Sequence, residues 1–173
     1  MENDARYQTI GPRIIAAIVD SFVLLPLVAV YWATEIPGVP MPVLILCYVL
    51  LAAASHIYNI YLHGRYGQTL GKMFAKVKVV TLDDGPISFY QAYLRDIPYL
   101  ILGVVSLIAD ITRMATAGGH VAVPEFGTDI LMDSITVLML IVVGADVFVT
   151  VAHPQRRSLH DLIAGTVAVR TNV

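Results

Sequence analysis

Charged residues are scarce in this chain of 173 residues, because Asp, Glu, Lys and Arg together make up only 14% of it. Soluble domains carry about 25%, whereas this chain is 57% hydrophobic. The net charge of −2 lacks the basic excess of a nucleic-acid-binding protein. The single cysteine, Cys47, cannot form an intramolecular disulfide. The composition therefore excludes a disulfide scaffold and indicates an integral membrane protein.

Four hydrophobic stretches are long enough to cross a bilayer, since about 20 helical residues span a core of about 30 Å. The first is too long for a signal-peptide core, so we expect it to remain in the protein. The third is less uniform: Ile97–Ala109 alone is too short, and extending it back to Ile87 includes Arg95 and Asp96. The predicted spans are residues 14–33, 43–62, 87–109 and 130–152.

Two segments outside the spans are predicted to lie at the membrane interface, at about residues 67–80 and 156–170. In the first, apolar residues fall at helical spacing from Leu70 to Val77, with Lys72 and Lys76 off that stripe. Its end alternates like a short strand. We expect basic side chains of both segments to contact lipid headgroups, namely Lys76, Arg156 and Arg157.

Basic residues predict the orientation. Of eleven Lys and Arg residues, only Arg113 lies in the loops at 34–42 and 110–129. The positive-inside rule therefore places both termini in the cytoplasm.

The two interfacial segments resemble each other, because residues 69–80 align with residues 158–169 without a gap, at an offset of 89. Either the chain consists of two duplicated hairpin halves, or the likeness is the one that any two amphipathic cytoplasmic helices share. If duplication is correct, residues 76–80 and 166–170 are expected to pair as two strands.

Ionisable groups recur at one depth in the predicted spans. Each predicted span contains one ionisable residue that lies about 4 to 8 Å from the midpoint of that span, toward the cytoplasm. In the third span this residue is Arg95, and Asp96 is adjacent to it. We expect Asp20–Arg95 and Asp146–His56 pairs. Such pairs could be structural clasps, or the layer could bind protons or cations. The four residues are Asp20, His56, Arg95 and Asp146.

Three motifs give the chain a family resemblance. They are Arg13-x-x-Ala16-x-x-x-Asp20, the run Gly67–Lys72, and Ser158-Leu159-His160-Asp161-x-x-Ala164-Gly165-Thr166. In this order they resemble the RDD family of small bacterial membrane proteins, as a single domain over residues 1–173. The resemblance implies that Arg13, Asp20 and Asp161 are the name residues and that the protein resides in the bacterial inner membrane. Sodium/proton antiport is attributed to some members, and related domains occur in membrane-assembly partners.

Near the cytoplasmic mouth, Asp161 is expected either to approach Arg13 and close the bundle, with Lys72 beside it, or to mirror Lys72 across the pseudo-axis. The histidines and acids of the tail, His153, His160 and Asp161, lack a diagnostic metal spacing. No nucleophile and base are arranged for catalysis, so we expect neither an enzyme nor a cofactor or metal.

The sequence thus predicts an all-α integral membrane protein, a bundle of four transmembrane helices with amphipathic helices on its cytoplasmic side. We predict monovalent cation/proton exchange, with a non-transporting scaffold or assembly module as the alternative. The expected partners are the lipid bilayer, Na⁺ and protons. Small residues at Ala52–Ser55 also permit a homo-oligomer or a membrane protein partner, and no nucleic acid is expected.

Overall fold

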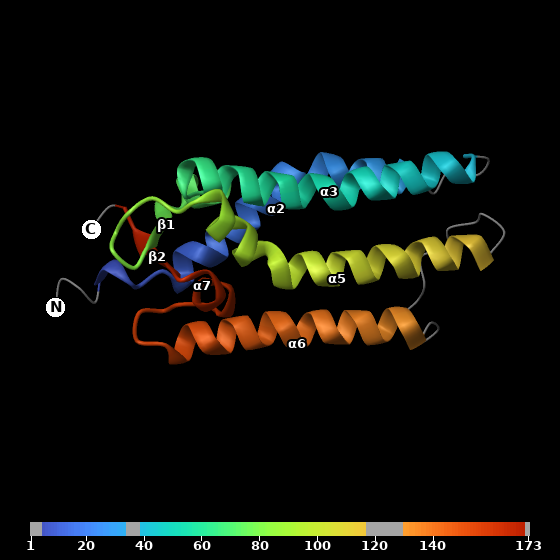
Figure 1. Cartoon of the computed structure of the whole chain (residues 1–173). Helices are drawn as coiled ribbons and strands as arrows, with labels where there is room; N and C mark the ends of the chain where they lie inside the picture. Colours follow the sequence, from blue (N-terminus) through green and yellow to red (C-terminus); the bar gives the residue numbers. More distant parts are fainter. Residues whose placement is uncertain (1–4, 34–38, 117–129, 172–173) are drawn as a thin grey trace.

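A computed structural model describes residues 5–33, 39–116 and 130–171. Most of these residues are helical. Four long helices, two short ones and one two-stranded sheet make up the described part of the chain (Figure 1). In chain order the elements are α2 (Ile10–Ala33), α3 (Met41–Tyr66), α4 (Leu70–Phe74), β1 (Val77–Thr81), α5 (Phe89–Thr116), α6 (Ile130–Ala152), α7 (Leu159–Ala164) and β2 (Thr166–Arg170).

Three of the long helices are apolar and long enough to cross a membrane: Ile10–Leu27 within α2, the whole of α3, and Ser134–Ala152 within α6. Large hydrophobic side chains stay exposed on them, for example Phe22 at 69% and Phe148 at 73%. In a soluble protein such surfaces would be unfavourable, so they fit contact with lipid. Candidate spans thus lie in three of the four predicted regions, and α2 begins four residues before the predicted start.

The third predicted span differs from the helix that contains it. α5 begins at Phe89 rather than at residue 87, and it continues past Ala109 to Thr116. It carries Arg95 and Asp96 in its first half, and it is not among the three helices above. Crossing of the membrane by α5 therefore stays a prediction. The loops that the orientation rests on, 34–42 and 110–129, lie largely outside the described residues.

The interfacial segments are each a short helix followed by a strand. β1 and β2 pair in antiparallel fashion, with Val77 opposite Arg170 and Thr81 opposite Thr166. The predicted pairing of these two segments is thus confirmed. Val79 and Ala168 are fully buried, and they pack with Ile87 and other apolar side chains in a small core beneath the sheet. Figure 1 shows the sheet and both termini at the same end of the long helices.

The order of elements repeats. α2, α3, α4 and β1 are followed by α5, α6, α7 and β2, and α4 packs against α2 as α7 packs against α5. The strand ladder has the same symmetry, because its central pair, Val79 and Ala168, consists of the two residues that the 89-residue offset equates. A ladder centred in this way is the arrangement expected of two duplicated halves related by a pseudo-twofold axis.

Candidate functional site

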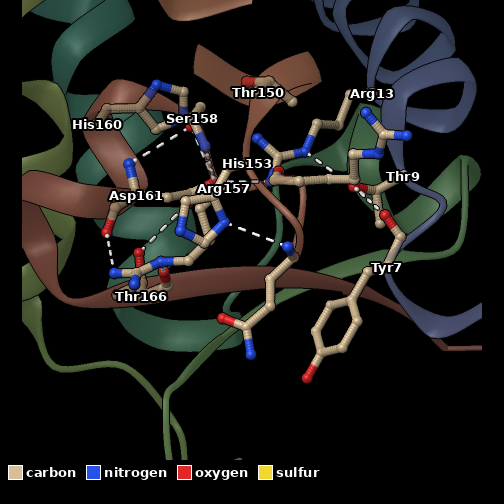
Figure 2. A network of polar contacts seen from close by, with 12 residues as sticks. Tyr7, Thr9, Arg13, Thr150, His153, Arg157, Ser158, His160, Asp161 and Thr166 are labelled. Carbon is tan, nitrogen blue, oxygen red and sulfur yellow. Dashed lines mark hydrogen bonds and ion pairs between the residues drawn. The ribbon is translucent and has the colours of Figure 1, made fainter. Parts of the chain in front are cut away.

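The carboxylate of Asp161 is the most enclosed charge among the described residues, with a fully buried side chain. Asp161 lies at the third position of α7, where it forms a capping box with Ser158, the residue that begins this helix. Its Oδ2 accepts hydrogen bonds from the Ser158 hydroxyl at 2.8 Å and from the Ser158 amide at 3.1 Å. Figure 2 shows this short turn with Asp161 next to Ser158 and Thr166.

Two arginines from different long helices neutralise Asp161. Arg13 of α2 donates to Oδ2 at 2.6 Å, and Arg95 of α5 donates to Oδ1. Burial would raise the pKa of Asp161, but Arg95 and Arg13 hold the pKa well below its usual range, so the carboxylate is ionised. The predicted contact between Arg13 and Asp161 is confirmed. We call this group of residues the Asp161 clasp: Arg13, Arg95, Ser158, Asp161 and Thr166.

Asp20 of α2 is held by three uncharged donors. Its Oδ1 accepts from the Tyr58 hydroxyl at 2.7 Å and from the Gly71 amide at 2.8 Å, and its Oδ2 accepts from the Thr69 hydroxyl at 2.6 Å. The predicted Asp20–Arg95 pair is wrong, because Arg95 contacts Asp161 instead. The prediction compared depths along the spans only. The N-terminal end of α4 folds back onto α2 and supplies Thr69 and Gly71, while α3 supplies Tyr58.

Gly71 makes this close contact possible. A Cβ atom at this position would overlap the carbonyl oxygen of Ala16 and lie 2.7 Å from the carboxyl carbon of Asp20. Only glycine therefore lets the first turn of α4 approach α2 closely enough for its amide to reach Asp20.

Asp146 and His56 each have a partner other than the predicted one. Asp146 of α6 accepts from His160 of α7, with Oδ1 lying 2.9 Å from Nδ1. His56 of α3 pairs with Asp96 of α5, with 2.6 Å between Nδ1 and Oδ2. The predicted Asp146–His56 pair is therefore wrong. Each acid meets the histidine on the element packed against it, and α7, placed outside the bilayer by the sequence, brings His160 up to α6.

Lys72 does not join the Asp161 clasp as predicted. Its Nζ lies 2.6 Å from Nε2 of His63, a buried residue of α3. Sequence reasoning missed His63, although it lies in the last turn of α3, where a basic residue is favoured by the helix dipole. It also missed Tyr58, Thr69, Ser158 and Thr166. Of these, Ser158 had a usable signal, since Ser-x-x-Asp before an apolar run is typical of a capping box.

The predicted ion-handling residues line two hollows of about 330 Å³ each. The first, the α2–α6 hollow, is lined by Asp20 and Asp146. The second, the α3–α5 hollow, is lined by His56, Arg95 and Asp96. Lys72 and His160 line both hollows, so they lie where the two meet.

The three residues expected at lipid headgroups have different surroundings. Lys76 is exposed. Arg156 donates to the carbonyl of Val151, and Arg157 donates to the carbonyls of Thr166 at 2.9 Å and Asp161 at 3.3 Å. Arg157 therefore has internal partners that fix the turn between α6 and α7. Headgroup contact stays a prediction for all three.

Among the residues that the structure describes, no three His, Cys, Asp or Glu side chains gather as a metal site. The arrangement offers acids, histidines and one amine around two hollows, next to three apolar helices. Such groups can bind protons or small cations and can also fix helices to one another.

The chain was compared with known proteins. Neither the curated proteins nor the solved structures gave a match. A family model does match, and it covers residues 7–165, from before α2 to the end of α7. That range includes the Asp161 clasp except for Thr166, the contacts of Asp20 and both hollows. The match extends over most of the chain, so this protein belongs to the RDD family and is a membrane protein of that family.

Proposed function

We propose that this protein exchanges a monovalent cation, Na⁺ in the first instance, for protons, and that the α2–α6 hollow is the cation site. The observation that carries the proposal is the position of Asp146 in that hollow. Its described contacts all use Oδ1, on His160, which leaves Oδ2 for a ligand. Asp20 lines the same hollow but already accepts three hydrogen bonds, so it adds negative charge rather than an open coordination position.

The Asp146–His160 pair can couple a cation to a proton. Burial and the nearby Arg95 lower the pKa of His160, while Asp146 opposes this by favouring the charged imidazolium. A cation that binds to Asp146 removes that support, so His160 releases its proton. When the cation leaves, a proton returns to His160. The hollow therefore favours one positive charge at a time, as exchange requires.

We further propose that α5 is a fourth transmembrane helix and that both termini face the cytoplasm of a bacterial inner membrane. α5 runs beside α3 and α6 in Figure 1. Residues 97–109 are uncharged, and Arg95 has its charge neutralised by Asp161. The basic residues near the sheet, such as Lys76 and Lys78, belong on the cytoplasmic side by the positive-inside rule.

A non-transporting scaffold or assembly module is the alternative function, and one observation favours it. The carboxylates of Asp161 and Asp20 both have internal partners, and these contacts join α2, α3, α4, α5 and α7. Charges used in this way fix helix positions and carry no cargo. The scaffold function needs no catalytic step, cofactor or metal, and neither does exchange.

Purified protein in liposomes with a pH-sensitive dye inside tests the proposal. A Na⁺ gradient is expected to drive proton movement with the unchanged protein and with the Asp83→Asn variant, whose carboxylate is exposed in a turn. Asp146→Asn is expected to abolish that movement. Absence of flux in the unchanged protein, with Asp146→Asn lowering only the unfolding temperature, would favour the scaffold.

A further inference from the structure

The two hydrogen bonds of His63, with Asn59 and with Lys72, define which nitrogen of its imidazole carries the hydrogen. Nδ1 of His63 is 2.8 Å from the carbonyl oxygen of Asn59. A carbonyl only accepts, so Nδ1 carries the hydrogen and donates it. Nε2 is then an acceptor, and the Lys72 amine, 2.6 Å away, donates to it. The imidazole is held in the neutral form that accepts from the lysine.

This pair has room for one exchangeable proton. Protonated Lys72 donates one of its three N–H groups to Nε2, and neutral Lys72 still has an N–H to donate, so the contact survives both states. A second proton on Nε2 would place two cations at hydrogen-bonding distance in a buried position, which Coulomb repulsion disfavours. Loss or gain of the single proton therefore requires no rearrangement of either side chain.

Charged groups on three neighbouring elements face the amine. Burial lowers the pKa of Lys72 most, followed by Arg95 of α5 and Arg13 of α2, and the resulting pKa is about 7. Asp161 and Asp20 oppose this, but the first is paired with the two arginines, and the second accepts hydrogen bonds from uncharged donors and keeps its negative charge. Among the described residues, no carboxylate forms an ion pair with Lys72. The other titratable residues that line the two hollows with it are Asp146 of α6, His160 of α7, His56 of α3, and Asp96 and Tyr99 of α5.

Lys72 also has access to both hollows. It lines the α2–α6 hollow, which contains Asp20 and Asp146, and it lines the α3–α5 hollow, which contains the His56–Asp96 pair. The Lys72 side chain is half-buried, so it is open to both hollows. A proton released by Lys72 can therefore enter either hollow.

We propose that the Lys72 amine, donating to His63, is a proton-binding site that connects the two hollows and exchanges one proton between them. In each transfer one N–H bond of the ammonium breaks, the electron pair stays on nitrogen, and the proton passes to water or to a base of the hollow. The reverse step restores the ammonium. This inference deepens the proposed exchange activity, but proton binding at Lys72 does not depend on the transport of any cation.

Lysine NMR tests the site directly, because the chain has only three lysines, Lys72, Lys76 and Lys78. Protein labelled with ¹³C at lysine Cε and placed in nanodiscs is expected to show one resonance, that of Lys72, that titrates near pH 7, well below the value of about 10.4 for a free lysine side chain. That difference is roughly a thousandfold in proton affinity. The near-neutral resonance should disappear in Lys72→Arg and persist in the matched variant Lys76→Arg.

Variants at position 63 separate a proton site from a packing role. His63→Gln keeps an acceptor for the ammonium, whereas His63→Phe removes it, so the lysine midpoint is expected to be lower in the Phe variant. Three lysines that all titrate above about pH 10, or a near-neutral resonance that remains in Lys72→Arg, would overturn the proposal. If Lys72→Arg does not fold, persistence of that resonance in both Lys76→Arg and Lys78→Arg assigns it to Lys72.

The liposome assay distinguishes this inference from the exchange activity. A near-neutral lysine together with no Na⁺-driven flux refutes exchange and leaves the proton site intact. Flux together with three ordinary lysines refutes the proton site alone. If both hold, Lys72→Met is expected to abolish the dependence of flux on pH near 7, and Lys76→Met is expected to leave it unchanged.

Discussion

Arg95, in the first half of α5, donates to the fully buried carboxylate of Asp161 at the start of α7. Because Arg13 of α2 donates to the other oxygen, one carboxylate joins both halves of the repeated arrangement. The net charge of these three groups is positive by one unit. That positive charge lies close to Lys72. After burial, Arg95 and Arg13 are the largest causes that lower the pKa of its amine.

Removal of the Asp161 charge is expected to be strongly destabilising. Asp161→Asn leaves the buried Arg95 and the half-buried Arg13 without their counter-charge, and loss of one partner of a buried ion pair costs about 3–5 kcal/mol. Equilibrium unfolding in mixed micelles measures this loss. Asp84→Asn is the control, because Asp84 pairs with Arg6 at the exposed surface, where an ion pair contributes little. Equal effects of the two substitutions would contradict the buried clasp.

The contribution of Asp161 to stability is expected to depend on pH in one direction. Its folded pKa is depressed, so ionisation stabilises the folded state, fully so above the unfolded value of about 3.9. The contribution is lost as pH falls below that value toward the folded pKa. The difference in unfolding free energy between the unchanged protein and Asp161→Asn should be constant from about pH 5 to 8 and shrink below about pH 4. A difference that instead grows on acidification would refute this sign.

Thr69 is expected to stabilise the first turn of α4 through its hydroxyl. That hydroxyl donates to Asp20 at 2.6 Å and accepts from the Lys72 amide at 3.3 Å. Thr69→Val removes both bonds at nearly constant shape and is expected to cost about 1–2 kcal/mol. Thr69→Ser keeps the hydroxyl and serves as the control in the same unfolding assay. A loss of similar size in both variants would show that packing, rather than the hydroxyl, matters here.

Gly71 and Gly144 are expected to respond oppositely to alanine. At Gly71 the new Cβ would overlap the Ala16 carbonyl and the Asp20 carboxyl, so α4 must move away from α2, at a cost of about 1–3 kcal/mol. At Gly144, in the middle of α6, nothing lies within 4 Å of the added Cβ. Alanine there should raise stability by about 0.5–1 kcal/mol through its better helix propensity. Comparison of the two unfolding temperatures tests the close approach of α4.

The hydrophobic pattern predicted the long helices because burial in lipid imposes a minimum length of apolar sequence. The alternation after Lys76 and the 89-residue offset likewise predicted the strand pair, since strand pairing needs only matched alternating segments. The limits of α5 were harder to predict because Arg95 and Asp96 interrupt its apolar pattern, although both have partners inside the protein.

The partners of the buried charges could not be predicted from depth. Asp20 and Asp146 have their contacts with α4 and α7, two short elements that follow the long helices and fold back against them. The hydrophobic pattern does not indicate that the chain folds back at α4 and α7, and this fold brings Thr69 to Asp20 and His160 to Asp146. Contact of Arg13 with Asp161 was predicted correctly because both were expected at one end of the bundle.

The strand ladder also has a consequence for the order of biosynthesis. β2 leaves the ribosome after every other described element, and it must pair with β1, which was made 89 residues earlier. Asp161 is likewise made long after Arg13 and Arg95, so both arginines are present in the nascent chain before their counter-charge has been synthesised. The end of the helices that carries the sheet can therefore close only after residues 161–170 have been made, and a nascent chain stalled before residue 161 would remain open at that end.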